Sequence, residues 1–341
     1  MTGTPLTQTK LRPRHLVLGV AALVASVLLS VLLGAAELGW QRVFAEIVAQ
    51  LTGGVSPLSE REAAILWHLR VPRVVLAVLV GGALAVSGAA FQGVFRNPLA
   101  DPYLLGAAAG AGFAVTLVIT GAPHAALSVP VQAAAFAGAL GGVGLTWLVG
   151  RSAGRDTATL VLAGVAVGAF LTAGQTFVQQ LRVDSLQQVY MWILGRLSTT
   201  GWREVLIVLP YLVLSAVVLC VCARLLDLLG TGDEEAAALG VHPGRVRLLV
   251  LVAASLATAA AVSTAGLIGF VGLVVPHLVR LAMGGSFRII VPMSLLFGGV
   301  FLVLADMLAR TLLAPAEIPI GVITAFTGAP FFAALLHRRR A

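Results

Sequence analysis

Two arginines at the start of a long apolar run carry side chains that could bind acidic groups. Arg70 and Arg73 lie on either side of Pro72 in the segment LRVPRVVLAV, residues 69–78. A guanidinium group is a rigid fork of N–H donors that fits a carboxylate with two hydrogen bonds. The same side chain can also anchor the end of a membrane helix among lipid headgroups. Both roles fit these residue types and their spacing.

Nucleotide hydrolysis by this chain is excluded by its lysine content. A phosphate-binding loop requires a lysine after its glycines, and Lys10, in the N-terminal tail, is the only lysine of the sequence. Any ATP chemistry linked to this chain must therefore take place on a partner. The six histidines are scattered, and no two of them have the helical spacing of metal ligands. We therefore expect no catalytic residue, no metal site and no cofactor on this chain.

Carboxylates within the apolar segments are equally sparse. Asp306, near the outer end of its segment, is the one acidic residue clearly inside an apolar run. A proton relay needs several ionisable groups at membrane depth. This scarcity argues against an ion-coupled carrier, although a carrier or channel that needs no ATPase is kept as an alternative.

The elements that position these residues are membrane-spanning helices. Apolar residues make up 59% of the 341 residues and charged residues 11%, which is less than half the charged share of a soluble domain. The apolar runs are mostly about 20 residues long, the length at which a helix crosses a bilayer. We find ten, at 16–36, 74–94, 104–120, 129–149, 158–178, 205–222, 246–265, 269–283, 289–308 and 321–336. They predict an all-α integral membrane protein, a polytopic bundle of about ten transmembrane helices.

Charge placement predicts which side of the membrane each end faces. An even number of spans returns the C-terminus to the side of the N-terminus, and the basic residues at both ends favour cytoplasmic termini. The first run is too long for a secretory signal, whose apolar region has about 7–15 residues. We predict a cytoplasmic tail at 1–15, one transmembrane domain at 16–337 and a basic cytoplasmic tail at 338–341. The net charge of +8 then reflects topology and not binding to nucleic acid.

Three arginines depart from this topology. Arg70, Arg73 and Arg310 fall at the outer ends of their segments, against the bias that places basic residues in the cytoplasm. Glu317 follows Arg310 by seven residues at the same end. Such a departure needs a reason, which is either anchoring among headgroups or a partner that binds these charges.

Glycine is concentrated inside the apolar runs, where it can bring helices together. Glycines four residues apart let helix backbones approach closely in lipid. The pairs with this spacing include Gly106 with Gly110, Gly138 with Gly142, and Gly164 with Gly168. We expect them to pack helices of this one chain tightly.

One cytoplasmic connection has helical character. In LLGTGDEEAAALGVHPGRVR, residues 228–247, an acidic triplet after Gly232 begins a short helix that Gly240 ends. Carboxylates in the first turn suit the positive end of a helix. Gly240 lies where two short helices meet, and we expect it to adopt a backbone conformation that side chains resist. The segment is either a solvated connector or a surface presented to a cytoplasmic partner.

Five segments of the chain resemble the sequences of a known protein family, which residue spacing alone does not reveal. They are RVPRVVLAVLVGGALAVSGAAFQGVFRNPLADPYLLG from residue 70, LAGVAVGAF from 162, ALGVHPGRVR from 238, STAGLIGFVGLVVPHLVR from 263 and LADMLARTLLAPAEIPIGVITAFTGAPFF from 304. The chain resembles the permease subunits of ABC importers for ferric siderophores, haem and cobalamin, often called the FecCD family. The resemblance implies a homodimeric permease of the bacterial cytoplasmic membrane, with the translocation path at the dimer interface. It also implies two ATPase subunits, which hold ATP and Mg, below the permease, and a substrate-binding protein above it.

The same resemblance implies two docking surfaces. Arginines at the positions of Arg70, Arg73 and Arg310 meet acidic residues on the two lobes of the binding protein. The connection between the sixth and seventh helices docks on the ATPase, which implies a coupling segment at 227–245. Its candidate contacts are Asp233, Glu234, Glu235, Leu239, Gly240 and His242.

A cytoplasmic gate is implied by two further stretches. The turn RNPLA after the second helix implies Asn97 and Leu99, and the start of the fifth helix implies Thr157 and Ala158. Relatives can carry a hydroxyl where this chain has Ala158. The motif PHLVR, residues 276–280, is recognisable, but the residues suggest no mechanism for it beyond a charged helix end.

The cargo that the resemblance favours is a ferric siderophore, with cobalamin and haem as alternatives. One residue bears on this choice. In MWILGRLSTTGW, residues 191–202, Arg196 occupies a position where many relatives carry a small residue, between the fifth and sixth helices and so at the outer mouth. Arg196 either anchors among headgroups or favours an anionic chelate by concentrating positive potential at the entrance.

Overall fold

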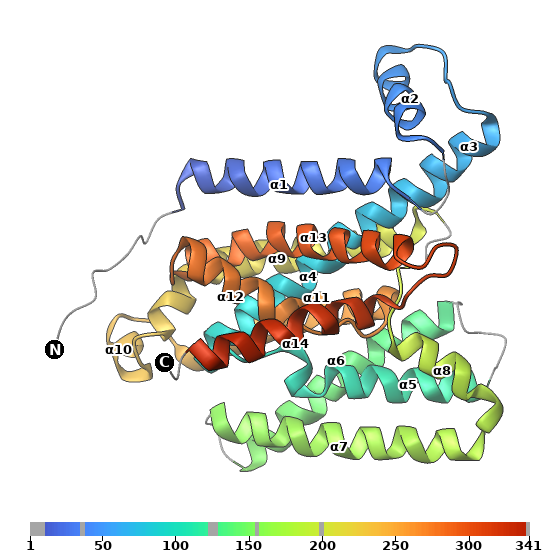
Figure 1. Cartoon of the computed structure of the whole chain (residues 1–341). Helices are drawn as coiled ribbons and strands as arrows, with labels where there is room; N and C mark the ends of the chain where they lie inside the picture. The colour runs from blue at the N-terminus through green and yellow to red at the C-terminus, as the bar shows by residue number, and fades with distance from the viewer. Residues whose placement is uncertain (1–10, 35–37, 122–128, 154–156, 198–200, 339–341) are drawn as a thin grey trace.

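The computed structural model describes residues 11–34, 38–121, 129–153, 157–197 and 201–338, which form a helical bundle without strands (Figure 1). Within these residues, seven helical segments are long and apolar enough to cross a membrane; two of the three shorter apolar helices lie between them in the sequence and the third follows the last of them. Together they follow the ten predicted runs in order, which confirms the predicted fold class. They are α1 (Pro13–Leu32), α4 (Val71–Phe95), α5 (Ala107–Gly121), α6 (Val129–Ala153), α7 (Thr157–Leu181), α9 (Arg203–Leu229), α11 (Pro243–Ala265), α12 (Val271–Met283), α13 (Phe287–Thr311) and α14 (Ile320–Arg338).

The bundle has two ends that carry different short elements. Figure 1 shows α10 (Asp233–Ala238) at the end where α1 begins and α14 finishes. The helices α2 (Trp40–Thr52) and α3 (Glu60–Ala64) lie at the opposite end. We call these the α10 end and the α2 end. The first helix begins and the last helix finishes at the same end of the bundle, which agrees with an even number of spans. We still predict, from the charges alone, that this end faces the cytoplasm.

The central helix of the bundle is α4, and it is central because its side chains are small. In its most apolar stretch, 83% of the residues are buried. Gly81 packs on Gly298 of α13, and Gly88 packs on Gly272 of α12, so closely that a β-carbon at Gly81 or Gly88 would overlap the carbonyl oxygen of its partner. Small residues provide this close packing in lipid, where no hydrophobic effect holds helices together.

The glycine pairs predicted from spacing also pack within the chain. Gly110 of α5 lies against Gly138 of α6, and Gly142 of α6 lies against the carbonyl group of Gly106. Gly164 of α7 lies against the backbone of Leu104. This packing confirms the prediction of tight contacts within one chain for these five glycines; the prediction fails for Gly168, which has no neighbour from another helix within 4 Å of the position of a β-carbon.

Two helices on opposite sides of the bundle are mostly exposed. Only 22% of the apolar stretch of α1 and 22% of that of α7 are buried. Figure 1 shows α1 along one side and α7 along the other. α1 packs on α13, where Gly19 contacts the side chains of Met293 and Leu296. The outward faces of α1 and α7 are apolar and suit contact with lipid or with another membrane protein.

Several elements at the α2 end were not predicted. The second apolar run, predicted at 74–94, continues backward without a break through the π-helix η1 (Ile65–Arg70) to Glu60. Ser59 caps this extension in a capping box with Glu62. The predicted run began too late in the chain because charged residues at 60–62 and 68–73 interrupt the apolar pattern. The helices α2 and α8 (Leu186–Ile193) were also missed.

Candidate functional site

The arginines predicted from topology meet at the α2 end in one charged cluster. Arg73 donates from Nε and Nη2 to Asp306 Oδ1, at 3.1 and 3.0 Å, and from Nη1 and Nη2 to the carboxylate of Glu317, at 2.8 and 3.0 Å. Arg310, one turn after Asp306 on α13, places Nε 2.9 Å from Asp306 Oδ2. One buried carboxylate is therefore shared by two arginines. With Arg70, we call these residues the arginine cluster.

Two members of the arginine cluster point into the protein. Arg70 is 6% exposed and Arg310 is 4% exposed. Arg70 Nη1 donates to the carbonyl oxygen of Val31 at 3.0 Å, and Arg310 Nη2 donates to Ser30 Oγ at 2.8 Å, so both hold the end of α1. Arg73 has 17% of its side chain exposed and Glu317 has 47%. The surface of the cluster is therefore formed by Arg73 and Glu317, and binding-protein docking by the three arginines stays a prediction.

Arg196 lies beside this surface. A cavity of about 140 Å³ is lined by residues that include Arg73, Arg196 and Glu317. Partial burial opposes ionisation of Glu317, but Arg73 donates to it, and Arg73, Arg310 and Arg196 together lower its pKa. The structure thus brings the entrance candidate together with the docking candidates, which the sequence alone did not link.

A second charged cluster lies at the α10 end and joins three elements. Asp233, the first residue of α10, accepts from Arg247 of α11, with Nη1 to Oδ2 at 2.8 Å and Nη2 to Oδ1 at 2.6 Å. Asp233 also pairs with Arg96 Nη2. These contacts, Arg247 first, lower the pKa of Asp233, so the carboxylate is charged near neutral pH. We call Arg96, Asp233 and Arg247 the Asp233 cluster.

Arg96 connects the Asp233 cluster to the turn predicted as a gate. It follows the last residue of α4 with a left-handed backbone, at φ 48°, and its Nε donates to the carbonyl oxygen of Leu229 at 2.7 Å. Asn97 Oδ1 then accepts from the backbone N–H of Leu99 at 2.9 Å, which closes the turn. The gate candidates Asn97 and Leu99 are therefore tied to α9 and α10 through the residue that precedes them.

The predicted coupling residues gather on an exposed short helix. α10 begins at Asp233 and is followed by Gly240 with φ 80°, which confirms the predicted helix and the predicted backbone at Gly240. Leu239 is 64% exposed, and no atom lies within 4 Å of the position of a β-carbon at Gly240. Glu234, Glu235 and His242 are also exposed. These exposed residues are accessible to a partner, and their contact with an ATPase stays a prediction.

The second pair of gate candidates begins α7. Thr157 is the first residue of that helix, and Ala158 is exposed. α7 packs against the 3₁₀ helix η2 (Pro102–Leu105), which follows the turn of Asn97 and Leu99. The two candidate gate stretches are thus connected through η2.

The PHLVR motif has a packing role. His277 is 3% exposed, and its ring centroid lies 6.1 and 6.4 Å from those of Phe331 and Phe332 on α14. Arg280 donates to Gln92 Oε1 of α4 at 3.4 Å and lies 5.3 Å above the ring of Phe287 on α13. The motif therefore joins α12 to three neighbouring helices.

Comparisons with known proteins agree with this architecture. A family model described as the FecCD transport family matches residues 22–338. The chain is 40% identical to the uncharacterized ABC transporter permease protein YvrB of Bacillus subtilis (strain 168), covering 95% of this chain and 93% of the relative. It is 42% identical to the cobalamin import system permease protein BtuC of Halobacterium salinarum, covering 89% and 80%. A solved structure described as an inward-facing conformation of a metal-chelate type ABC transporter has a TM-score of 0.82 and 28% identity, covering 96% of this chain and 100% of the other.

Proposed function

This chain belongs to the FecCD transport family, and we propose that it is the membrane permease of an ABC importer that carries a ferric siderophore across a bacterial cytoplasmic membrane. The family match over residues 22–338 is the observation that carries the transport function. Cobalamin is the second candidate cargo, because a cobalamin import permease is 42% identical to this chain. Haem, the third cargo of this family, is the remaining candidate.

We further propose that two copies of the chain form the transport path. An apolar groove of about 600 Å³ lies between the end of α8, the start of α12 and α14, with Leu194, Phe270 and Phe326 in its wall. A second copy facing this groove would enclose an apolar path wide enough for a bulky chelate. Two ATPase subunits would bind at the α10 ends, and a binding protein would dock at the α2 ends.

The Asp233 cluster offers a physical route from ATP hydrolysis to the gate. An ATPase that moves α10 also moves Asp233, whose carboxylate is bound to Arg96. Arg96 directly precedes the turn of Asn97 and Leu99, so movement of α10 would shift that turn. This chain would then catalyse no bond chemistry and would convert motion of its partners into alternating access.

Loss of the Asp233 cluster is expected to uncouple transport from ATP hydrolysis. Asp233→Ala should retain ATPase binding and hydrolysis, because Leu239 and the other exposed residues of the coupling segment are unchanged. Coupling free energies of roughly 1–3 kcal/mol correspond to changes in coupling of about 5–150-fold. Because these side chains are partly exposed, we expect the amount of chelate transported per ATP hydrolysed to fall by about fivefold to tenfold. The measurement is chelate transported per ATP hydrolysed in proteoliposomes.

A double-mutant cycle separates this role from a general loss of activity. Arg96→Ala alone and Asp233→Ala alone remove the same contact, so the double variant should lose little more than either. Arg245→Ala, an exposed arginine of α11 outside the cluster, is the matched control and should keep a near-normal ratio. Fully additive losses of the two alanine variants would contradict the proposed linkage.

Uptake assays test both the class and the cargo. A strain that lacks its own permease should regain uptake of one cargo among ferric siderophores, haem and cobalamin when it receives this chain together with a cognate ATPase and binding protein. The ATPase should also purify with the permease. Transport in liposomes without any ATPase would contradict the importer function and would favour a carrier or channel.

The same assay tests the proposed role of Arg196. Arg196 lines the small cavity at the α2 end with Arg73 and Glu317, and because Arg73 is paired with Asp306 and Glu317, Arg196 supplies the added positive charge at the proposed entrance. Arg196→Ser is therefore expected to reduce uptake of anionic chelates more than uptake of neutral ones. Equal reductions in the uptake of anionic and neutral chelates would contradict this role and would indicate that Arg196 only anchors the chain at the membrane surface.

A further inference from the structure

The helix α2 carries an apolar stripe that is turned away from the protein, while Val43 and Glu46, both fully buried, face inward. Trp40, Phe44, Val48 and Leu51 follow one another at helical spacing and are 59%, 57%, 41% and 82% exposed. The polar residues Arg42, Glu46 and Gln50 form the opposite stripe. A helix on a protein surface in water normally buries its apolar stripe and exposes its polar one. In α2 only Val43 and Ile47 of the apolar residues pack against the protein, and the stripe from Trp40 to Leu51 stays exposed.

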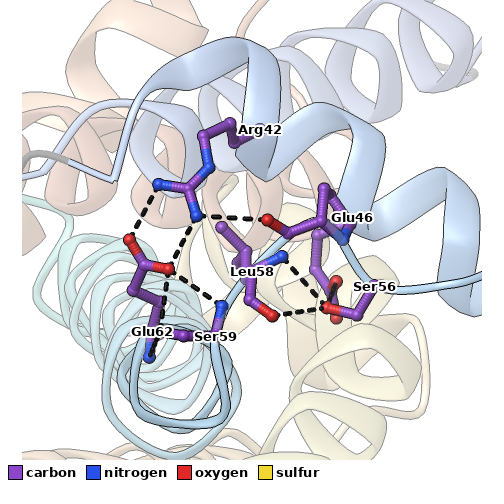
Figure 2. A network of polar contacts seen from close by, with 7 residues as sticks. Arg42, Glu46, Ser56, Leu58, Ser59 and Glu62 are labelled. Carbon is purple, nitrogen blue, oxygen red and sulfur yellow. Dashed lines mark hydrogen bonds and ion pairs between the residues drawn. The ribbon is translucent and has the colours of Figure 1, made fainter.

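Specific hydrogen bonds tie Arg42 and Glu46 to the segment that leads into α4 (Figure 2). Arg42 donates to both carboxylate oxygens of Glu62, at 2.8 and 2.7 Å, and to the carbonyl oxygen of Pro57 at 3.1 Å. Glu46 is fully buried and accepts from the Ser56 hydroxyl and, at 3.0 Å, from the indole N–H of Trp67. These donors, the Ser56 hydroxyl first, hold the pKa of Glu46 below its usual range, so it is charged near neutral pH.

These contacts fix which face of α2 is free. Rotating the helix to bury its apolar stripe would break the Arg42 pair and expose the partners of Glu46. Each exposed large apolar side chain gives up about 1.5–3 kcal/mol relative to full burial. A row of four such side chains therefore indicates a nonaqueous neighbour.

Chain continuity places that neighbour at the membrane boundary. Seven residues separate the end of α1 at Leu32 from Trp40, and at about 3.5 Å each they span at most roughly 25 Å. In Figure 1, α2 lies across the direction of α1, at the α2 end and on the outer side of α1. The outward face of α1, with Val17 68% and Val24 51% exposed, is the lipid-facing surface nearest in sequence.

We propose that α2 is an interfacial helix that inserts Trp40, Phe44, Val48 and Leu51 into the lipid leaflet at the α2 end. Aromatic residues are favoured at this depth, and an uncharged stripe of this kind lies parallel to the membrane surface. The polar stripe binds the segment from Ser56 to Trp67, which leads directly into Arg70 and Arg73. The lipid surface would thus set the position of the helix start that carries the arginine cluster. This inference concerns the membrane alone and is independent of cargo, ATPase and binding protein.

Spin labels on the full-length protein test the proposal. In a background with Cys220→Ala and Cys222→Ala, nitroxides are attached at Phe44→Cys and Val48→Cys, with Ala45→Cys as control, an exposed residue of the same helix off the apolar stripe. The protein is reconstituted in vesicles of phosphatidylethanolamine and phosphatidylglycerol. Labels at 44 and 48 should collide several-fold more with oxygen, which partitions into lipid, than with a water-soluble nickel chelate, and the label at 45 should show the reverse preference.

Three results would overturn the proposal. Equal nickel access at 44, 48 and 45 would show that the stripe faces water. If the labels at 44 and 48 lost access to the nickel chelate only after an extracytoplasmic binding protein was added, the stripe would be the contact surface for that protein. Spin–spin broadening that disappears on dilution with unlabelled protein would assign it to a second copy. Two reporter positions are used so that a fault in one labelled variant does not decide the outcome.

Discussion

Asp306→Asn is expected to destabilise the folded permease by about 3–5 kcal/mol, the cost of breaking a buried ion pair by removing one partner. The Asp306 side chain is 1% exposed and binds two arginines, one of which, Arg310, is also buried. The substitution keeps the size of the side chain but leaves two guanidinium charges with less compensation. Unfolding of the purified protein in mixed micelles, followed as the denaturing detergent is increased, measures the change.

Glu317→Gln is the matched control for Asp306→Asn. Glu317 binds the same arginine, but 47% of its side chain is exposed, so water and salt screen the pair. We expect a loss of less than about 1 kcal/mol. If both variants unfolded at the same detergent fraction as the unsubstituted protein, the arginine cluster would contribute little to folding, and its role would be confined to the surface.

Gly88→Leu is expected to prevent stable packing of the central helix. A side chain at Gly88 would overlap the carbonyl oxygen of Gly272, and a backbone group in a neighbouring helix cannot move without separating α4 from α12. Overpacking of this kind costs about 3 kcal/mol or more. We expect most of the protein to elute as aggregate, or not to be recovered, in size-exclusion chromatography after detergent extraction.

Gly141→Ala tests whether the effect comes from packing and not from loss of a glycine. Gly141 is also inside a membrane helix, but no atom lies within 4 Å of the position of its β-carbon. Alanine at such a site favours the helix by up to about 1 kcal/mol. Normal recovery of Gly88→Leu would mean that α4 and α12 separate readily, contrary to the packing described above.

The ten apolar helices could be predicted from the sequence because lipid imposes a length and an apolar composition on any span. The short helix α10 could be predicted as well, since its acidic first turn and its terminal glycine are local signals. The pairing of Arg73 with Asp306 could not, because 233 residues separate the two and no local pattern records that pairing. The same reason applies to Arg96 and Asp233, which are 137 residues apart.

The helix α2 shows a different limit of sequence reasoning. Its apolar and polar stripes are visible in the spacing of Trp40, Phe44 and Val48 and of Arg42 and Glu46, but periodicity does not tell which stripe faces the protein. That choice depends on Glu62, Ser56 and Trp67, which supply partners for the polar stripe. The burial of Arg70 could not be predicted either, because Arg70 donates to a backbone carbonyl group on α1 and no side-chain pattern marks that contact.

The packing of α1 on α13 has a consequence for how the chain is made. At about 5–20 residues per second, the ribosome needs on the order of tens of seconds to synthesise the residues between Gly19 and Leu296, which contacts it. During that interval α1 must be stable in lipid without its partner, and its mean hydropathy of 2.4 suits a helix that inserts alone. The glycine-rich α4 also emerges long before α12 and α13, although it occupies the centre. The nascent permease therefore has to keep α1 and α4 in the membrane with incomplete packing until α12 and α13 have been made.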